Sequence, residues 1–236
     1  MKRDANLPNC DSCPTRPESP FGVLSPVDLE MMNQCKTSNK YKKNQIIFYE
    51  GNKPFGIHCI KSGRLKLYRV GNDGREQIVR LVQPGDIVGF KDLISTHDYS
   101  LSAEALEDSE VCFLDRNAFF TLMDKSSKLA FKFLEYSCEE QRKNEDTICS
   151  FAQNSVRERV ANTLLILKER YGLKTDRGWK LDIRLKRDEI AGLAGTVLES
   201  AVRYLSEFKG DGIIALEGKE ITILKLEKLI KITGNS

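Results

Sequence analysis

Two cysteines near the start of the chain have the spacing best suited to metal or redox chemistry. Cys10 and Cys13 are separated by only two residues, in a chain of 236 residues that contains seven cysteines. Two thiols at that spacing lie too close together to serve as ordinary core side chains, so the pair favours metal binding or redox exchange. The odd number and scattered positions of the cysteines argue against a framework of disulfide bonds.

Near the other end of the chain, Glu199 and Arg203 have the spacing of two side chains on one face of a helix. An arginine on such a face can donate two hydrogen bonds to guanine, and a carboxylate can accept one from cytosine. Two structural interpretations stay open beside base recognition. Glu199 also completes a capping box with Thr196, and Arg203 has Glu207 as an ion-pair partner or a phosphate as its ligand.

The residues around this pair form a helix-turn-helix pattern. A first helix is predicted from Arg187 to Leu193, where Ala191 is small enough for a second helix to cross closely. Gly195 permits the sharp turn, and Thr196 is predicted to cap the second helix. Apolar residues at steps of three and four predict the buried stripe of that helix: Val197, Leu198, Ala201, Leu205 and Phe208.

A hairpin is predicted after the second helix. Two short apolar runs, 213–216 and 221–224, are separated by Glu217, Gly218 and Lys219, which have the chemistry of a tight β-turn. Helices and hairpin together predict a winged helix-turn-helix. Residues 157–231 contain 16 Lys and Arg against 12 Asp and Glu, whereas the net charge of the whole chain is only +3. The excess of positive charge here agrees with binding to phosphates.

The first half of the chain has the pattern of a closed β module. Short β runs alternate with glycines, which predicts a compact sandwich or jelly roll instead of a parallel sheet. The predicted strands cover residues 45–49, 56–60, 64–70, 76–82, 87–90, 102–106 and 110–114.

A long helix is predicted after this module, because residues 126–153 contain neither proline nor glycine. A heptad-like seam runs along it: Phe131, Leu134, Cys138, Gln141, Glu145, Ile148 and Ala152. Such a helix either packs on its own β module or forms a parallel coiled coil with a second subunit. We favour the dimer, since two-fold DNA readers need half-sites about one helical turn apart.

These patterns predict an α+β fold in four parts. They are an irregular, proline-rich N-terminal arm (1–22), an antiparallel β-roll or jelly roll (23–125), a long dimerisation helix (126–153) and a winged helix-turn-helix domain (154–236). In the last part, Ser155 and Glu158 form a capping box that starts a helix extending to about Tyr171. Val160, Leu164 and Leu167 are expected to face inward on that helix.

Several classes of protein are not expected. No apolar run is long enough to cross a bilayer and the first 30 residues have no signal-peptide core, so the sequence predicts a cytoplasmic protein without a membrane partner. An enzyme is not expected either, because the chain has only two histidines, no P-loop, no dinucleotide-binding glycine motif and no HExxH motif.

The order of β-roll, long helix and winged helix-turn-helix resembles the CRP/FNR family of bacterial transcription regulators, and its FNR branch in particular. The resemblance covers nearly the whole chain. It is most specific at 63–68 (GRLKLY), 84–90 (PGDIVGF) and 105–112 (ALEDSEVC), and at Glu199 with Arg203. It implies a homodimer on double-stranded DNA, in which these two side chains contact bases of a palindromic, TGA-type operator. Contact with RNA polymerase is implied as well.

The other predicted DNA contacts surround the recognition helix. Residues expected at phosphates or at the start of the helix are Thr196, Lys186, Arg187, Ser200 and Lys219. Val202 stands where some relatives carry a polar base-reading residue, which leaves the outer bases of the half-site open. A second class of function also stays open: a β-roll module that regulates a protein partner. Such a module would lack the steep salt dependence of DNA binding.

The predicted sensor region departs from the relatives that bind cyclic AMP. Those relatives carry a Gly-Glu-Leu motif and an Arg-Ser-Ala motif, whose arginine pairs with the cyclic phosphate. Here the matching stretches read GFKDL and YSL, and no arginine occurs between Arg80 and Arg116. Lys91 offers only a point charge, so cyclic AMP is not expected. The predicted effector pocket consists of Gly89, Phe90, Lys91, Asp92, Tyr99, Ser100 and Leu101.

A metal centre is the competing sensor. Relatives that sense oxygen hold a 4Fe-4S cluster with three cysteines in the N-terminal arm and one in the β-roll. Cys10, Cys13 and Cys112 match three of these ligands, whereas Ser19 stands about where the third arm cysteine should be. The resemblance therefore implies an incomplete set of ligands.

Other interpretations of the sensor stay open. The next cysteines, Cys35 and Cys59, fall in different predicted elements, and Cys112 lies in an alternating strand that accepts a small core side chain. Haem is disfavoured because His58 and His97 are the only histidines. An unidentified small molecule in the β-roll, a thiol switch and the absence of any effector remain as alternatives.

Overall fold

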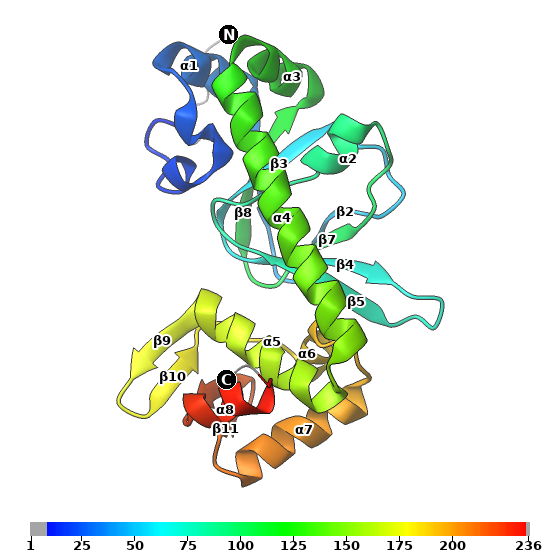
Figure 1. Cartoon of the computed structure of the whole chain (residues 1–236). Helices are drawn as coiled ribbons and strands as arrows, with labels where there is room; N and C mark the ends of the chain where they lie inside the picture. The colour runs from blue at the N-terminus through cyan, green and yellow to red at the C-terminus, as the bar shows by residue number, and fades with distance from the viewer. Residues whose placement is uncertain (1–8, 235–236) are drawn as a thin grey trace. The chain divides into compact units, whose positions relative to one another are not determined.

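The computed structural model of the chain describes residues 9–234, which form two compact units (Figure 1). The first unit comprises residues 9–69 and 79–142, and the second comprises residues 70–78 and 143–234. Residues 1–8 of the predicted arm and the last two residues of the predicted winged domain lie outside the described residues. Among those that are described, no helix combines the length and the apolar character needed to cross a bilayer.

The N-terminal arm contains short helices. Its prolines lie at the starts of these helices, where they do not prevent helix formation. Two single-turn 3-10 helices, Arg16–Glu18 and Pro20–Val23, precede α1, Pro26–Cys35. Each has a proline in its first two positions, where the missing N–H removes no helical hydrogen bond. Ser25 caps α1 by accepting a hydrogen bond from the backbone N–H of Asp28 at 3.2 Å.

Two four-stranded antiparallel sheets form the β-roll, which confirms the predicted fold class. The first sheet has the order β1-β8-β3-β6: Lys36–Tyr41, Ser109–Asp115, Gly56–Ser62 and Ile87–Val88. The second has the order β2-β7-β4-β5: Ile46–Phe48, Ser102–Ala105, Leu65–Val70 and Glu76–Val82. Strand β1 is absent from the predicted set because its sequence, KTSNKY, has almost no apolar residue to show a periodicity.

The predicted strand over residues 87–90 is wrong at its end. Only Ile87 and Val88 belong to the strand, and α2, Phe90–Ser95, begins almost directly afterwards. Gly89 makes this change of direction, since its φ of +83° lies in the left-handed region that favours glycine. The turn directs the side chain of Phe90 into a hydrophobic core.

The first sheet is buried on both faces by two separate cores. On one face, Ile57 of β3 packs in a core with Phe21 of the N-terminal arm and Phe119 of α3, Arg116–Lys125. On the other face, Ile60 packs in a second core with Phe48 of the second sheet. Successive residues of a strand point to opposite faces, so alternate residues of β3 enter different cores.

Helix α4, Ser127–Gln153, has two different faces. Phe133 and Glu140 are buried. The predicted seam lies on other sides of the helix and is open in the single chain, where Phe131 is 60% exposed, Leu134 57% and Ile148 66%. The helix therefore packs on its own β-roll with one face and leaves uncovered a seam that is apolar towards its ends and polar in the middle, at Gln141 and Glu145.

A buried charged network fixes α4 against the β-roll. The guanidinium of Arg80 in β5 donates to the carboxylate of Glu140, and to the hydroxyl of Tyr136 at 2.8 Å. It also lies 3.3 Å from a carboxylate oxygen of Asp86, to which the hydroxyl of Tyr136 donates at 3.1 Å. Burial raises the pKa of Tyr136 to about 12. No sequence pattern indicated this network, because its members lie in separate elements.

The second unit has the predicted winged helix-turn-helix and three further elements. Helix α5, Val156–Tyr171, begins at the predicted capping box and buries Val160, Leu164 and Leu167. The predicted helices and wing are α6, Arg187–Leu193; α7, Leu198–Gly210; β11, Ile214–Glu217; and β12, Glu220–Ile223. The additional elements are β9, Gly172–Thr175; β10, Gly178–Leu181; and α8, Leu226–Ile232. The four strands form one sheet in the order β11-β12-β10-β9.

The predicted cap of the second helix is wrong. Val197, not Thr196, is the N-cap residue of α7, and it makes no side-chain cap hydrogen bond. Gly195, with φ +59°, extends the turn, and the backbone N–H of Thr196 donates to the carbonyl of Ala191 at 3.0 Å. Thr196 therefore ends the preceding turn. Leu198, predicted to be in the buried stripe, is the first residue of α7 and is 44% exposed.

Candidate nucleic-acid interface and cysteine pocket

A single arginine of α5 positions the turn between α6 and α7. The guanidinium of Arg159 donates to the carbonyl of Ala194 at 2.9 Å, to that of Gly195 at 3.1 Å and to that of Asn154 at 2.9 Å. It also lies over the ring of Phe151. Since a guanidinium can satisfy several carbonyls in one plane, this residue fixes the turn to the end of α4. Arg159 was not among the predicted site residues, because its partners are backbone atoms.

The side chains predicted to read bases lie on the outer face of α7. Glu199 and Arg203 are exposed, as is Val202, while Ser200 is half-buried. The guanidinium of Arg203 lies 4.7 Å from the ring centroid of Tyr204 and donates to its hydroxyl at 3.0 Å.

The structure does not support a helix cap by Glu199 or an ion pair of Arg203 with Glu207, and contact of Arg203 with a phosphate stays a prediction. Glu207 pairs with Arg157 at 2.7 Å and so has another partner than Arg203. Thr196 lies before the N-cap of α7, so Glu199 is not the third residue of a helix that Thr196 caps. Both side chains are therefore placed where a ligand outside the protein can reach them.

The residues predicted to hold phosphates lie at the ends of α6 and the wing. Lys186 is the exposed N-cap residue of α6, and its backbone N–H donates to the carboxylate of Glu189 at 2.6 Å. Lys219 is exposed in the wing turn. Arg187 differs, since its guanidinium is half-buried and donates to the carbonyl of Gly218 at 2.8 Å. Burial lowers the pKa of Arg187. This arginine joins α6 to the wing.

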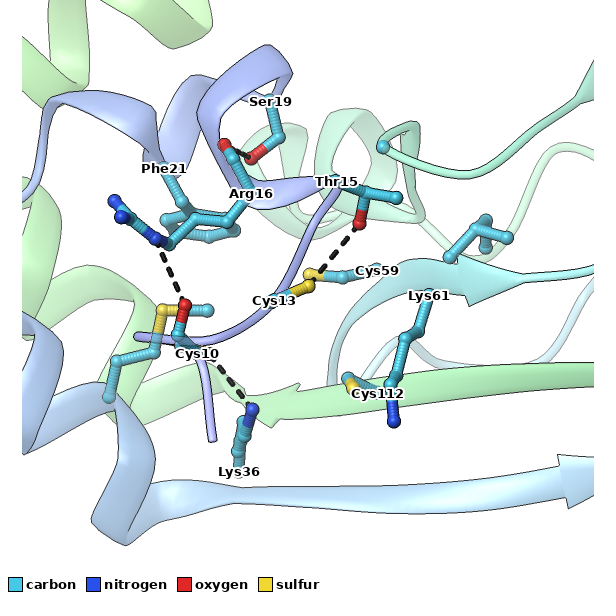
Figure 2. A pocket seen from close by; sticks show the side chains of 13 residues that line it. Cys10, Cys13, Thr15, Arg16, Ser19, Phe21, Lys36, Cys59, Lys61 and Cys112 are labelled. Atoms are coloured by element: carbon cyan, nitrogen blue, oxygen red, sulfur yellow. Dashed lines mark hydrogen bonds between the residues drawn. The ribbon is translucent and has the colours of Figure 1, made fainter. Parts of the chain in front are cut away.

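A separate pocket in the first unit brings four cysteines together. Cys10 and Cys13 of the arm, Cys59 of β3 and Cys112 of β8 all line it (Figure 2). In the sheet, Cys59 lies directly opposite Cys112, so the two side chains share the face that the arm covers. The three predicted cysteines are thus joined by Cys59, which the sequence had placed in a different element.

Hydrogen bonds hold the arm across the pocket. The backbone N–H of Cys10 donates to the side chain of Asn33 at 2.8 Å, and Nε of Arg16 donates to the carbonyl of Cys10 at 3.0 Å. The hydroxyl of Ser19 donates to the carbonyl of Arg16 at 2.8 Å. Ser19, which stands where a third arm cysteine was expected, therefore serves the turn of the arm.

One buried ammonium lies beside the thiols. Lys36 of β1 is only 4% exposed, and its Nζ donates to Sγ of Cys10 at 2.9 Å. Burial raises the pKa of Cys59, as it does that of Cys112, although Lys36 opposes the shift in both. Burial also acts to raise the pKa of Cys13, but hydrogen bonds from Thr15 and Arg16 outweigh it and the pKa is lowered.

The donor set of this pocket fits an iron-sulfur cluster better than a single ion. Among residues 9–234, no three ligand side chains are grouped so that they could hold one metal ion. A 4Fe-4S cluster is larger, and each of its four thiolate ligands binds a different iron. Cys10, Cys13, Cys59 and Cys112 would hold such a cluster, which supplies one-electron redox chemistry when bound.

Gly89 and Tyr99 of the predicted effector pocket lie against each other, whereas its two aromatic side chains enter different cores. Phe90 is buried in the core beneath the arm, where its ring packs against Phe133 and Tyr136. Tyr99 belongs to the other core and stacks on Phe48 with ring centroids 4.0 Å apart. Burial raises the pKa of Tyr99 to about 12. The remaining members, from Gly89 to Leu101, range from half-buried to exposed: Gly89, Asp92 and Leu101 are half-buried, while Lys91 and Ser100 are exposed.

His58 is placed as a core residue. It is 8% exposed and packs between Phe48 and Phe113, with ring centroids 5.2 and 5.1 Å away. Burial lowers the pKa of His58 to about 4. His97 lies on the surface. These positions favour packing or surface exposure over axial ligation for the two histidines, and the expectation that haem is disfavoured stays a prediction.

Two family models match separate parts of the chain. The model named Cyclic nucleotide-binding domain matches residues 38–126, and the model named Crp-like helix-turn-helix domain matches residues 158–232. These matches agree with the β-roll and with the winged helix-turn-helix described above.

Relatives of known role match both parts at once. The chain is 30% identical over 218 residues to the Anaerobic regulatory protein of Haemophilus influenzae, covering 92% of this chain and 84% of that one. It is 28% identical over 234 residues to the Transcriptional activator protein FnrL of Cereibacter sphaeroides, covering 97% and 93%. The structure of FixK2 from Bradyrhizobium japonicum matches with a TM-score of 0.75 and 25% identity, over 84% of this chain and 96% of that one. The predicted resemblance is thereby confirmed: the chain belongs to the CRP/FNR family and is a transcription regulator with a helix-turn-helix for binding DNA.

Proposed function

We propose that the protein binds a palindromic, TGA-type operator as a homodimer, with Arg203 and Glu199 of each α7 reading the inner bases. The observation that carries this proposal is the position of these two side chains, exposed on one face of the second helix of a Crp-like helix-turn-helix. Their types suit guanine and cytosine edges in the major groove. Lys186, Lys219 and Ser200 border the same face and would hold phosphates.

The dimer is formed through α4 in this proposal. Its apolar seam is open in the single chain, and heptad seams of this kind are buried between two helices. A two-fold protein places its recognition helices about one turn of DNA apart, which matches a palindromic operator. Once bound, the dimer would regulate transcription through contact with RNA polymerase, as family membership suggests.

Control of this activity is assigned to the first unit, and within it to the cysteine pocket. A signal that changes the pocket would alter the arm and the sheet face beneath it, since both contribute its walls. A 4Fe-4S cluster is the favoured occupant because the donor set is rich in thiols. Cyclic AMP is disfavoured, because the stretch that matches the phosphate-binding motif of the relatives has no arginine to pair with the cyclic phosphate.

The test of the DNA-binding proposal is a titration of fluorescent duplexes at several salt concentrations. We expect tight binding to a palindrome of two TGA-type half-sites and weaker binding when one half-site is scrambled. For about six to ten phosphate contacts, affinity should fall about 10³- to 10⁵-fold between 50 and 200 mM salt. A second candidate, a module that docks on a protein, predicts no preference between the duplexes and no steep salt dependence.

The dimer is tested on the same protein by sedimentation. Replacing Leu134 by Asp places a charge in the seam, so we expect the sedimentation coefficient of a monomer and loss of preference for the palindrome over a single half-site. Lys132→Asp, an exposed residue outside the seam, is the matched control. A wild-type chain that sediments as a monomer while bound to the palindrome would contradict the dimer.

A further inference from the structure

The cysteine pocket offers a fourth ligand where the arm lacks one. Cys10, Cys13 and Cys112 are the three ligands that the sequence implies, and Ser19 uses its hydroxyl in a turn of the arm. Cys59 lines the same pocket and comes from an element that supplies no ligand in the pattern of the relatives. The set of four thiols is thus complete in space although it is incomplete in the arm.

The sheet holds Cys59 in a fixed relation to Cys112. These two residues are direct partners across the antiparallel pair of β3 and β8. Directly opposed side chains lie on the same face, about 4.5 to 5.5 Å apart at Cβ. That face is the one covered by Cys10 and Cys13, as Figure 2 shows. A ligand set of two sheet cysteines and two arm cysteines would clamp a cluster from opposite sides.

The charges around the pocket independently call for an anionic occupant. Among the residues that line the pocket in the described part of the chain, three are cations and none carries a carboxylate. Lys61 has an ion pair with Glu110 at 3.0 Å, and Arg16 bonds a backbone carbonyl. Lys36 is different, since it is buried and Sγ of Cys10 is its hydrogen-bond acceptor. A buried ammonium without an anion is costly, and four thiolates around a cluster would supply negative charge.

We propose that Cys59 is the fourth thiolate ligand of a 4Fe-4S cluster held by Cys10, Cys13 and Cys112, with Lys36 as the buried cation beside it. This inference rests on the proposed function, in which the pocket is the sensor. Binding joins two ferrous ions, two ferric ions, four sulfide ions and four thiolates without any change of oxidation state, and the four thiols release their protons to solvent. A disulfide between Cys59 and Cys112 is the rival chemistry, but it would leave Lys36 without a negative partner.

The experiment is anaerobic reconstitution of the full chain with equal amounts of ferrous and ferric iron and with sulfide, followed by iron and sulfide counts and Mössbauer spectroscopy. We expect about four irons per subunit for wild type, falling to about one or fewer for Cys59→Ala, as for Cys13→Ala. Cys35→Ala and Cys149→Ala are matched controls, because both cysteines are exposed and lie outside the pocket. Both should keep the iron content of wild type.

Cys59→Ser and thermal unfolding of the iron-free proteins guard against a folding defect. A Cys59 variant that unfolds like wild type and still loses its iron supports ligation. Wild-type iron content and spectrum in both Cys59 variants would overturn the assignment. So would a wild-type chain that takes up no iron, and so would one that forms a Cys59–Cys112 disulfide in its place.

Operator binding separates this inference from the proposed function. Iron-free wild type that selects the palindrome would leave DNA reading intact and reject the cluster. A chain that holds about four irons through Cys59 but shows no preference for the palindrome would support the cluster and reject the proposed operator binding. The two proposals therefore fail in different assays.

Discussion

The two units differ in how far apart along the chain their proposed functional residues lie. In the second unit, the proposed DNA contacts all fall within residues 186–219, on two consecutive helices and a hairpin. In the first unit, the pocket cysteines extend from Cys10 to Cys112 and come from the arm and two strands. The DNA-reading surface is therefore a local structure, whereas the pocket exists only when distant segments are assembled.

The two regions therefore depend on different kinds of contact. The helix-turn-helix keeps its geometry through short-range caps and turns. A pocket assembled from distant segments depends on sheet register and on how the arm is held. It can exchange one ligand position for another, provided that the new side chain points into the same space.

The largest effect is expected when the charged network around Arg80, which joins distant segments of the first unit, is disturbed. Arg80→Met removes the cation from the buried carboxylate of Glu140 and from the half-buried one of Asp86, so the free energy of unfolding should fall by about 3 to 5 kcal/mol. Urea denaturation, monitored by far-ultraviolet circular dichroism, measures this free energy of unfolding. Adding Glu140→Gln to this variant should recover part of the loss. A change below about 0.5 kcal/mol, the size expected for a surface substitution, would contradict the role of the network.

A smaller effect is expected for the local surface of the second unit. Arg203→Ala should cost about 1 to 3 kcal/mol of operator binding and relax specificity at its guanine, because the two hydrogen bonds to that base are lost. Competition binding with operators changed at each position measures this. Equal losses on operator and on random DNA would show that Arg203 only contacts phosphates.

A further prediction concerns Lys36, the buried lysine of the cysteine pocket. Lys36→Met keeps the side-chain length but removes the charge, so the reconstituted chain should lose iron to a chelator about 10 to 100 times more readily than wild type. Lys61→Met, which removes a cation already paired with Glu110, is the control and should change the rate less. Equal rates for wild type and Lys36→Met would leave Lys36 with a purely structural role.

The smallest expected effect concerns a helix cap. Ser155 accepts a hydrogen bond from the backbone N–H of Glu158 at 3.3 Å, and the side chain of Glu158 accepts one from Ser155 in return. Ser155→Ala should therefore lower the stability of the second unit by about 1 kcal/mol, and Ser155→Asp should retain most of it. Thermal unfolding of the two variants makes the comparison. If Ser155→Ala and Ser155→Asp unfolded at the same midpoint temperature, the cap would contribute nothing to stability.

Sequence patterns predicted local features well and spatial neighbours poorly. The capping box of α5 and the buried stripe of Ala201, Leu205 and Phe208 could be predicted, because each depends on residues only a few positions apart. The cap at Thr196 was wrong because Gly195 moves the start of α7, which the helical period alone does not show. Cys59 was unassigned because only the pairing of β3 with β8 places it opposite Cys112.

The three hydrogen bonds of Arg159 have a mechanical consequence. They join Asn154, the residue that directly follows α4, to the carbonyls of Ala194 and Gly195 that lead into α7. The loop after α4 is therefore not a slack hinge. A rotation at this end of α4 would therefore move α7, because the guanidinium of Arg159 connects the two segments.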